Sequence, residues 1–521
     1  MRPSGPILVL FCAALLSCSS SSTPSGDNAG DAGPLLGSDA GSDATMGSPG
    51  DAGSDSGREG GMSDAGVDAG PITGNDGGND ASVAADSGSE SGSGVDASFV
   101  EAPHPSLPIL INNGGVVLHT PKIVTITFPG DADMATYQAF GATATNNAWW
   151  DAIRKDYCDF GSSSSCVGDG PPGTSVELTT PPAASYADSQ DPTATVSLKS
   201  FIQSLIPATI PQPDAQTLLA FYFPTSTTIT LDSAKSCQAF GGYHNSMTVN
   251  GVTFAYAIMP ECAAAPQQTL TVAQETILAA SHEFAEAATD PFTPNAYYLN
   301  FNDPAIAPWN ALAGGEVGDM CFDLLGLRQD ETTENGFIVQ RSWSNLHALA
   351  GLDPCVPAAA APYFSIAPEM WLLTATPGGP PVTMQGDAFS EAATAAWIVH
   401  GDDDNATQAN PNPYLTITFN GAKTATVQNG DKVTIGVTLN QDPGALTGTV
   451  GGAIGLIISA DGPTVATSTK GHVWPFMVTS PADALDAGLN MVDAAQDLPR
   501  RMQAMTSDQR SKVQRMLRRL R

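Results

Sequence analysis

The position of the cysteines is the strongest constraint on how this chain can fold. Of its eight cysteines, two lie in the first 18 residues and the other six lie between residues 158 and 355. An even number of cysteines in an exported chain favours disulfides over free thiols. Zinc-thiolate ligation is the alternative, but the chain has no Cys-x-x-Cys pair to support it. We predict three sequential disulfides: Cys158–Cys166, Cys237–Cys262 and Cys321–Cys355.

The first 18 residues have the form of an export signal. Arg2 is followed by an apolar stretch at residues 7–16, which is too short to span a membrane. The stretch ends in Leu-Leu-Ser-Cys18, a string that resembles a bacterial lipobox. That resemblance implies that Cys18 carries a lipid and anchors the protein to a membrane, as an outer-membrane or cell-surface lipoprotein. An ordinary cleaved signal with a chance cysteine is the alternative.

Residues 19–102 cannot build a hydrophobic core. They consist mainly of Ser, Gly, Asp and Ala, and they carry 15 acidic residues and one arginine, Arg58. Such a segment buries too little apolar surface to offset the entropy that ordering would cost. We therefore predict a disordered acidic tether between the lipid and the folded part of the chain.

The segment 103–357 carries the signals of a mixed domain. Strands are predicted at 122–128, where apolar and polar residues alternate, and at the apolar runs 218–223 and 254–259. Helices are predicted at 134–154 and 196–205. This mixture indicates an α/β or α+β domain with a central sheet.

A longer helix is predicted to begin after Thr271. Thr271 and Gln274 have the spacing of a capping box, the following residues are rich in Ala and Glu, and a proline stops the helix. At about 100° per residue, an apolar face opposes a polar stripe of Glu275, His282 and Glu286. The plain interpretation of such a stripe is a solvated helix face.

The string His282-Glu283-Phe-Ala-Glu286 favours a different interpretation, because it is one residue away from the zincin signature H-E-x-x-H. In that signature two ligands at i and i+4 bind one zinc ion, and the intervening Glu is the general base. Glu286 takes the place of the second histidine, and a carboxylate is an acceptable zinc ligand. A third ligand must come from downstream, where Glu316 and Asp319 follow.

We therefore predict a zinc site held by His282, Glu286 and Glu316, with Glu283 as the general base. Asp319 is predicted as a fourth ligand or as the residue that orients His282. Another divalent ion, manganese or calcium, is the alternative to zinc.

Several short motifs in residues 105–355 resemble the bacterial relatives of the plant EXORDIUM (phosphate-induced protein) family. They are an N-terminal strand, a Trp-Trp helix, a cysteine with a Gly-x-His-like turn, the H-E-x-x-E helix with its proline, and an acidic turn that ends in Cys. In this chain they stand at 122–128, Trp149-Trp150, Cys237 with 241–244, 281–291 and 316–321. The resemblance implies a secreted or wall-associated protein with no established reaction.

The chain departs from that pattern before His244. The preceding residues are Ala-Phe-Gly-Gly, where the family has a tight Cys-Gly pair. We interpret His244 as a hydrogen-bonded residue of a loop, with a place on the metal or substrate side of the site as the alternative.

Beyond residue 362 the chain changes to short apolar runs separated by turns. Strands at 414–419, 432–439 and 453–458, with Asn-Gly turns at 420–421 and 429–430, suggest an immunoglobulin-like sandwich over 362–480. The acidic run 402–405 is interpreted as a solvated loop, because it lacks the glycine and glutamate of an EF-hand. Residues 481–521 are predicted to form a basic helical tail that docks on an acidic surface, with an anionic membrane surface as the alternative.

The charge balance excludes one class of function. The chain has 53 acidic and 20 basic residues, so we expect no binding to nucleic acid. The fold class predicted from the whole sequence is a zincin-like α/β (or α+β) domain with disulfides, an all-β immunoglobulin-like sandwich and a short helical tail. The first hypothesis for function is an exported, lipid-anchored, zinc-dependent hydrolase, a peptidase acting on an extracellular peptide or cell-wall polymer. The alternative is a non-enzymatic surface protein for binding or adhesion.

Overall fold

The structure is a computed structural model, and most of the chain beyond residue 98 is described. The described residues are 99–188, 196–231, 234–263, 269–292, 296–300, 303–313, 315–321, 324–403, 413–443 and 452–482. The predicted signal with Cys18 lies outside them, as do nearly all of the predicted tether and nearly all of the predicted basic tail. Within the described part, no helix is long and apolar enough to cross a membrane.

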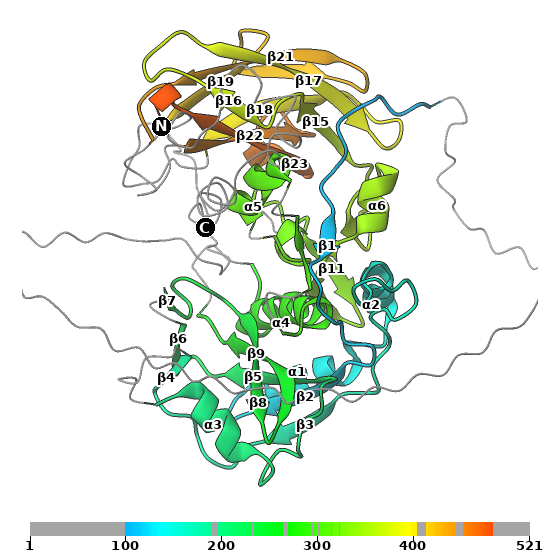
Figure 1. The fold of residues 1–521 in the computed structure, drawn as a ribbon, viewed down its shortest axis with the longest axis vertical. Coiled ribbons are helices and arrows are strands. Elements are labelled where there is room, and N and C mark those ends of the chain that lie inside the picture. The colour runs from blue at the N-terminus through cyan, green and yellow to red at the C-terminus, as the bar shows by residue number, and fades with distance from the viewer. Residues whose placement is uncertain are drawn as a thin grey trace, which may run out of the picture. The chain divides into compact units, whose positions relative to one another are not determined.

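A five-stranded sheet forms the centre of the first part of the chain (Figure 1). Its strands run in the order β3 (Thr174–Glu177), β2 (Lys122–Thr127), β5 (Thr217–Phe223), β9 (Val252–Pro260) and β8 (Tyr243–Val249). The first four strands are parallel to one another, and β8 is antiparallel to β9. The central sheet predicted from the sequence is confirmed, and β8 lies at its edge.

Both faces of this sheet are covered, which explains why β5 is apolar at every position. Leu218, Ala220 and Tyr222 face the helices α1 (Met134–Thr143) and α4 (Val272–Thr289). The alternate residues, Phe221 among them, face a second cluster with α3 (Leu198–Leu205) and a small sheet. That small sheet consists of β4 (Ser185–Asp188), β6 (Thr228–Leu231) and β7 (Ala234–Lys235). A strand buried on two sides is expected to lack alternation.

The helices agree with the predictions in one place and differ in another. The helix predicted at 134–154 is two helices, because α1 ends at Thr143 and α2 (Ala148–Ile153) begins after Asn147. The side chain of Asn147 accepts a hydrogen bond from the Trp150 N–H and so caps a new helix start. The capping box at Thr271 and Gln274 is confirmed, and α4 has the predicted length.

All three predicted disulfides are present: Cys158–Cys166, Cys237–Cys262 and Cys321–Cys355. The third one ties the short turn at 315–321 to β14 (Cys355–Val356). The remaining elements of this part are β1 (Leu110–Asn112), β10 (Tyr297–Leu299), α5 (Ala307–Ala313), β11 (Glu331–Glu334), β12 (Phe337–Gln340), β13 (Ser342–Trp343) and α6 (Asn345–Ala350).

The described C-terminal part is all β, as predicted, and consists of two sheets. One has the order β15 (Phe364–Pro368), β17 (Val382–Ser390), β21 (Lys432–Leu439) and β19 (Leu415–Phe419). The other has the order β16 (Leu372–Thr374), β23 (Gly471–Thr479), β22 (Gly452–Ala460), β18 (Trp397–Asp403) and β20 (Thr424–Val427). Side chains from both sheets, such as Ile435 and Val399, share one buried core.

The Asn-Gly turn predicted at 420–421 is confirmed, because Asn420 and Gly421 have positive φ and Phe419 pairs with Ala422 across them, although the next strand, β20, belongs to the other sheet. One expectation for this part needs correction. Asp403 is not a solvated loop residue, because it ends β18 and is buried. Its carboxylate accepts hydrogen bonds from the Tyr414 and Leu415 N–H groups. Asp402 also lies in β18, and residues 404–405 lie outside the described residues.

Candidate metal centre

The part of α4 that carries the H-E-x-x-E motif is buried. The interpretation of its polar stripe as a solvated face is therefore wrong for His282 and Glu286. The side chains of His282, Glu283 and Glu286 are 12%, 7% and 1% exposed. α4 packs against β9 and β8 on one side and against β12 on another, which leaves no free face at this level of the helix. Burying two carboxylates on one helical turn is costly unless a positive charge compensates them.

The turn at 315–321 brings two more carboxylates to the same place. The Gly318 and Asp319 N–H groups each donate to Glu286 Oε1 at 3.2 Å, and the Glu316 N–H donates to Asp319 Oδ2 at 3.1 Å. Gly318 stands so close to His282 that an added Cβ would lie 2.7 Å from Nδ1 of its ring. A side chain at position 318 would therefore push the turn away from the helix.

His282 lies at the centre of a first group of donors. Its Nε2 is 3.0 Å from Glu286 Oε1 and 3.7 Å from Asp319 Oδ1. Its Nδ1 is 3.0 Å from Gln340 Oε1, and Gln340 is oriented by donating from Nε2 to the Gly318 carbonyl at 2.8 Å. A ring that donates from Nδ1 leaves Nε2 as the ligand atom, the arrangement typical of metal-bound histidines.

His244 lies at the centre of a second group. Its Nδ1 is 3.3 Å from Glu283 Oε2 and 3.6 Å from Glu286 Oε2, and its Nε2 is 3.8 Å from Glu316 Oε1. The interpretation of His244 as a loop residue is wrong, because it is the second residue of β8 and faces α4. Asn250-Gly251, between β8 and β9, is a hairpin signal that could have placed His244 on a strand.

The six predicted or newly found residues therefore meet, but Glu316 does not lie where it was predicted. Asp319, predicted as a fourth ligand or as the residue that orients His282, lies beside His282 and Glu286. Glu316, predicted as the third ligand beside them, lies beside His244 instead. Glu283 and Glu286 both contact His244, so Glu286 belongs to both groups.

Burial and crowding shift the pKa values of all six groups. Burial raises the pKa of Glu283, Glu316 and Asp319, and the Glu286 charge raises the last two further, well above their usual range. Burial alone would lower the pKa of the two histidines, but the neighbouring carboxylates outweigh it and raise both well above 6.5. Although burial acts in the opposite direction, the two imidazoles hold the pKa of Glu286 at about 2. A cluster of this kind binds protons tightly unless another cation takes their place.

The donor set fits a divalent metal ion. A tetrahedral ion with bonds of about 2.1 Å separates its donor atoms by about 3.4 Å. The measured separations from His282 Nε2, 3.0 and 3.7 Å, lie on either side of that value. Two carboxylates and one imidazole form a hard donor set, which suits zinc and also manganese.

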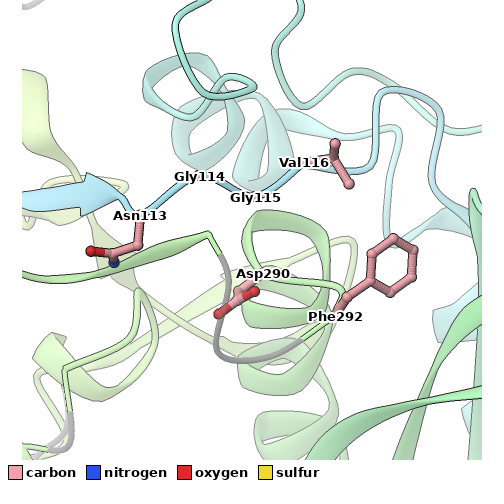
Figure 2. Close-up of a pocket in the computed structure, with 6 residues that line it drawn as sticks. All are labelled: Asn113, Gly114, Gly115, Val116, Asp290 and Phe292. Carbon is pink, nitrogen blue, oxygen red and sulfur yellow. The ribbon is translucent and has the colours of Figure 1, made fainter. Parts of the chain in front are cut away.

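A separate cavity of about 290 Å³ opens beyond the C-terminal end of α4 (Figure 2). It is lined by residues 113–116 and by Asp290 and Phe292, which follow the helix. None of the six cluster residues lines this cavity.

The comparisons with known proteins leave the family open. No family model matches the chain, and no curated protein matches it. A crystal structure of the periplasmic chaperone SfaE is similar over 22% of this chain and 56% of its own, with 10% identity and a TM-score of 0.16. Domain 1 of VCBP3 from Branchiostoma floridae is similar over 24% of this chain and 99% of its own, with 10% identity and a TM-score of 0.16. The chain thus spans about half the length of the chaperone it matches. The resemblance to the EXORDIUM family stays a prediction.

Proposed function

We propose that this protein is an exported, lipid-anchored, metal-dependent hydrolase that cleaves peptide bonds. One observation carries the proposal: His282, Glu286 and Asp319 converge with ligand atoms within 4.8 Å of one another, and Glu283 adjoins them on the same helix. We propose zinc as the ion, with a zincin-like arrangement of the surrounding domain.

The roles of the chain's own residues follow from their contacts. His282 Nε2, Glu286 Oε1 and Asp319 Oδ1 would hold the ion, and Gln340 keeps the His282 ring in the tautomer that frees Nε2. A bound divalent ion supplies Lewis acidity, which polarises a carbonyl and acidifies water. Glu283 would take the proton from the attacking water, and burial, which raises its pKa, makes it a stronger base.

An extended peptide is the substrate class that this site suits best. β8 is the edge strand of the described sheet, and His244 stands on it beside the cluster. An edge strand offers unpaired N–H and C=O groups that can pair with an added strand. A peptide bound along β8 would therefore pass the cluster with its backbone held in place. A peptide cross-link of a cell-wall polymer would be held in the same way.

The place of action is proposed from the sequence and from the disulfides. Three disulfides favour an oxidising compartment outside the cytoplasm. Cys18 is proposed as the lipid anchor, and Cys18→Ala should move the protein from the membrane fraction to the soluble fraction. Retention of the Cys18→Ala protein in the membrane fraction would refute the lipid anchor.

The experiment compares hydrolysis of fluorescently labelled casein by the full chain and by two variants. Glu283→Gln should lower the rate by about 10²–10⁴-fold, because it removes the general base, while the ion on His282 stays bound. Glu275→Gln is the matched control, since Glu275 lies in the first turn of the same helix. Casein hydrolysis that is absent from the wild type, or equal in wild type and Glu283→Gln, would favour the non-enzymatic binding protein.

A further inference from the structure

The two oxygens of Glu286 face two different histidines. Oε1 lies 3.0 Å from His282 Nε2, and Oε2 lies 3.6 Å from His244 Nδ1. A carboxylate that presents one oxygen to each of two imidazoles has the orientation of a bridging ligand between two metal ions. The helix alone would not produce this arrangement, since the second histidine comes from β8.

The surroundings of His244 repeat those of His282. Each ring directs one nitrogen towards Glu286 and a second acidic ligand, and its other nitrogen towards an oxygen outside the group. For His282 that outer oxygen is Gln340 Oε1 at 3.0 Å, and for His244 it is Glu316 Oε1 at 3.8 Å. The distances from His244 Nδ1 to Glu283 Oε2 and Glu286 Oε2, 3.3 and 3.6 Å, also lie on either side of the tetrahedral donor separation of about 3.4 Å.

Two buried polar atoms beside this second group also lack a hydrogen bond. His244 Nε2 and Glu316 Oε1 are buried, and neither forms a hydrogen bond with any described residue. The side chains of His244 and Glu316 are only 3% and 5% exposed, so water does not compensate them from outside. Native proteins rarely leave such atoms unsatisfied without a functional reason.

The charge balance favours two ions over one. Four carboxylates converge here, and among the described residues the only cationic groups within ion-pair distance of them are the two imidazoles. With both imidazoles neutral, as ligands must be, one divalent ion leaves two buried negative charges and two ions leave none.

We propose that the cluster binds two divalent metal ions, bridged by Glu286. The first ion is the one held by His282, Glu286 and Asp319, and the proposal rests on that site. The second is held by His244 Nδ1, Glu286 Oε2 and Glu283 Oε2, and Glu316 Oε1 lies 3.8 Å from the other nitrogen of the His244 ring. Glu283 keeps its other oxygen, Oε1, which packs against Gly242, and so it can bind the ion and still take up a proton.

The test measures metal stoichiometry in the full chain after chelation and reloading with Mn²⁺. We expect about two ions per chain in the wild type and about one in His244→Ala. His282→Ala should lose the first ion. His119→Ala is the matched control, because His119 forms a similar imidazole–carboxylate pair with Asp159 at 2.9 Å on the surface. Its stoichiometry should equal that of the wild type.

Electron paramagnetic resonance of the wild type gives a reading that needs no variant. With one equivalent of Mn²⁺ the spectrum should be that of an isolated ion. With two equivalents it should change to that of an exchange-coupled pair. A saturating stoichiometry of one, lost in His282→Ala and kept in His244→Ala, would overturn the second site and leave the proposed function standing. A single ion that is lost in His244→Ala but kept in His282→Ala would overturn both the second site and the proposed function. A wild type that binds no metal ion would also overturn both.

Discussion

Two groups of buried charges in this protein are built in opposite ways. Arg341 and Asp353 form an ion pair at 2.8 Å, with side chains only 5% and 2% exposed. Arg341 also donates to the Gln329 and Pro357 carbonyls, and Lys470 lies 3.8 Å from the same aspartate. In the cluster around Glu286, four carboxylates share two imidazoles and no described lysine or arginine.

The pKa values show what this difference means. Although burial acts in the opposite direction, Arg341 holds the pKa of Asp353 below its usual range. In the cluster, burial and the charge of Glu286 raise the pKa of Glu316 and Asp319 instead. The first group is complete within the chain and stabilises the fold. The second has no described lysine or arginine to balance its carboxylates, which supports the proposal that it binds a metal ion.

The largest expected change in stability is at the buried ion pair of Arg341 and Asp353. Arg341→Met should lower the free energy of unfolding by about 3–5 kcal/mol, because it leaves Asp353 buried with less compensation. The loss, measured by urea denaturation, should be the same with and without a chelator. Arg328→Met, at an exposed pair with Glu331, should cost less than about 1 kcal/mol. If Arg341→Met and Arg328→Met lowered the free energy of unfolding equally, the Arg341–Asp353 pair would have no special role in stabilising the fold.

Zinc should stabilise the protein through the cluster around Glu286, whereas the Arg341–Asp353 ion pair should not respond to metal. At a free zinc concentration about 100 times the dissociation constant, binding should stabilise the wild type by about 2.7 kcal/mol. Thermal denaturation with zinc and with EDTA measures the difference. Glu286→Ala should abolish it, because Glu286 belongs to both donor groups. A zinc effect of equal size in Glu286→Ala would show that the metal binds elsewhere.

The metal-free protein should lose stability as pH rises. Folding raises the pKa of Glu316 and Asp319, so their protonated forms stabilise the fold and ionisation destabilises it above their ordinary values of 4.5 and 3.8. The pKa of both histidines is raised above 6.5, so their contribution is also lost as pH rises through the raised values. Glu286, with a pKa of about 2, acts in the opposite sense only below pH 4.5.

We therefore expect the EDTA-treated chain to lose stability between pH 5.5 and about 8.5. Zinc should reduce the loss, since the ion takes the place of the protons. Urea denaturation across this range measures both curves. A metal-free protein that becomes more stable across the same range would contradict the account.

The smallest expected effect is a gain in stability from a substitution in the buried cluster. Glu316→Gln removes a buried acid whose Oε1 forms no hydrogen bond with any described residue, so the metal-free chain should gain about 1 kcal/mol at pH 8. The same substitution should weaken the binding of metal, because it removes the carboxylate beside His244. A variant that is less stable in EDTA would indicate that Glu316 has a structural role.

The sequence predicted the local part of the site well. α4 agrees with its prediction because a capping box, helix-favouring residues and a proline all act within one segment. The H-E-x-x-E spacing then places His282, Glu283 and Glu286 on neighbouring positions of that helix. The disulfide pairs could be predicted for a similar reason, since each joins two cysteines that are consecutive cysteines in the sequence.

What the sequence could not predict depends on distant segments. His244 reaches the cluster because β8 pairs with β9 in one register, opposite Ala257, on the face that α4 covers. The choice between Glu316 and Asp319 depends on how the turn at 315–321 is held by Gln340 and by the Cys321–Cys355 disulfide. The burial of the polar stripe depends on β12, which packs on α4 from beyond that turn.

Metal analysis of the purified full chain, beside Glu286→Ala, tests the central claim most directly. Mass spectrometry of the elements should find at least one divalent ion per wild-type chain, and the variant should lose it. Both proteins should show the same three disulfides, which controls for folding. The same substoichiometric metal in both proteins would contradict the account, because the carboxylates around Glu286 would then bind protons alone.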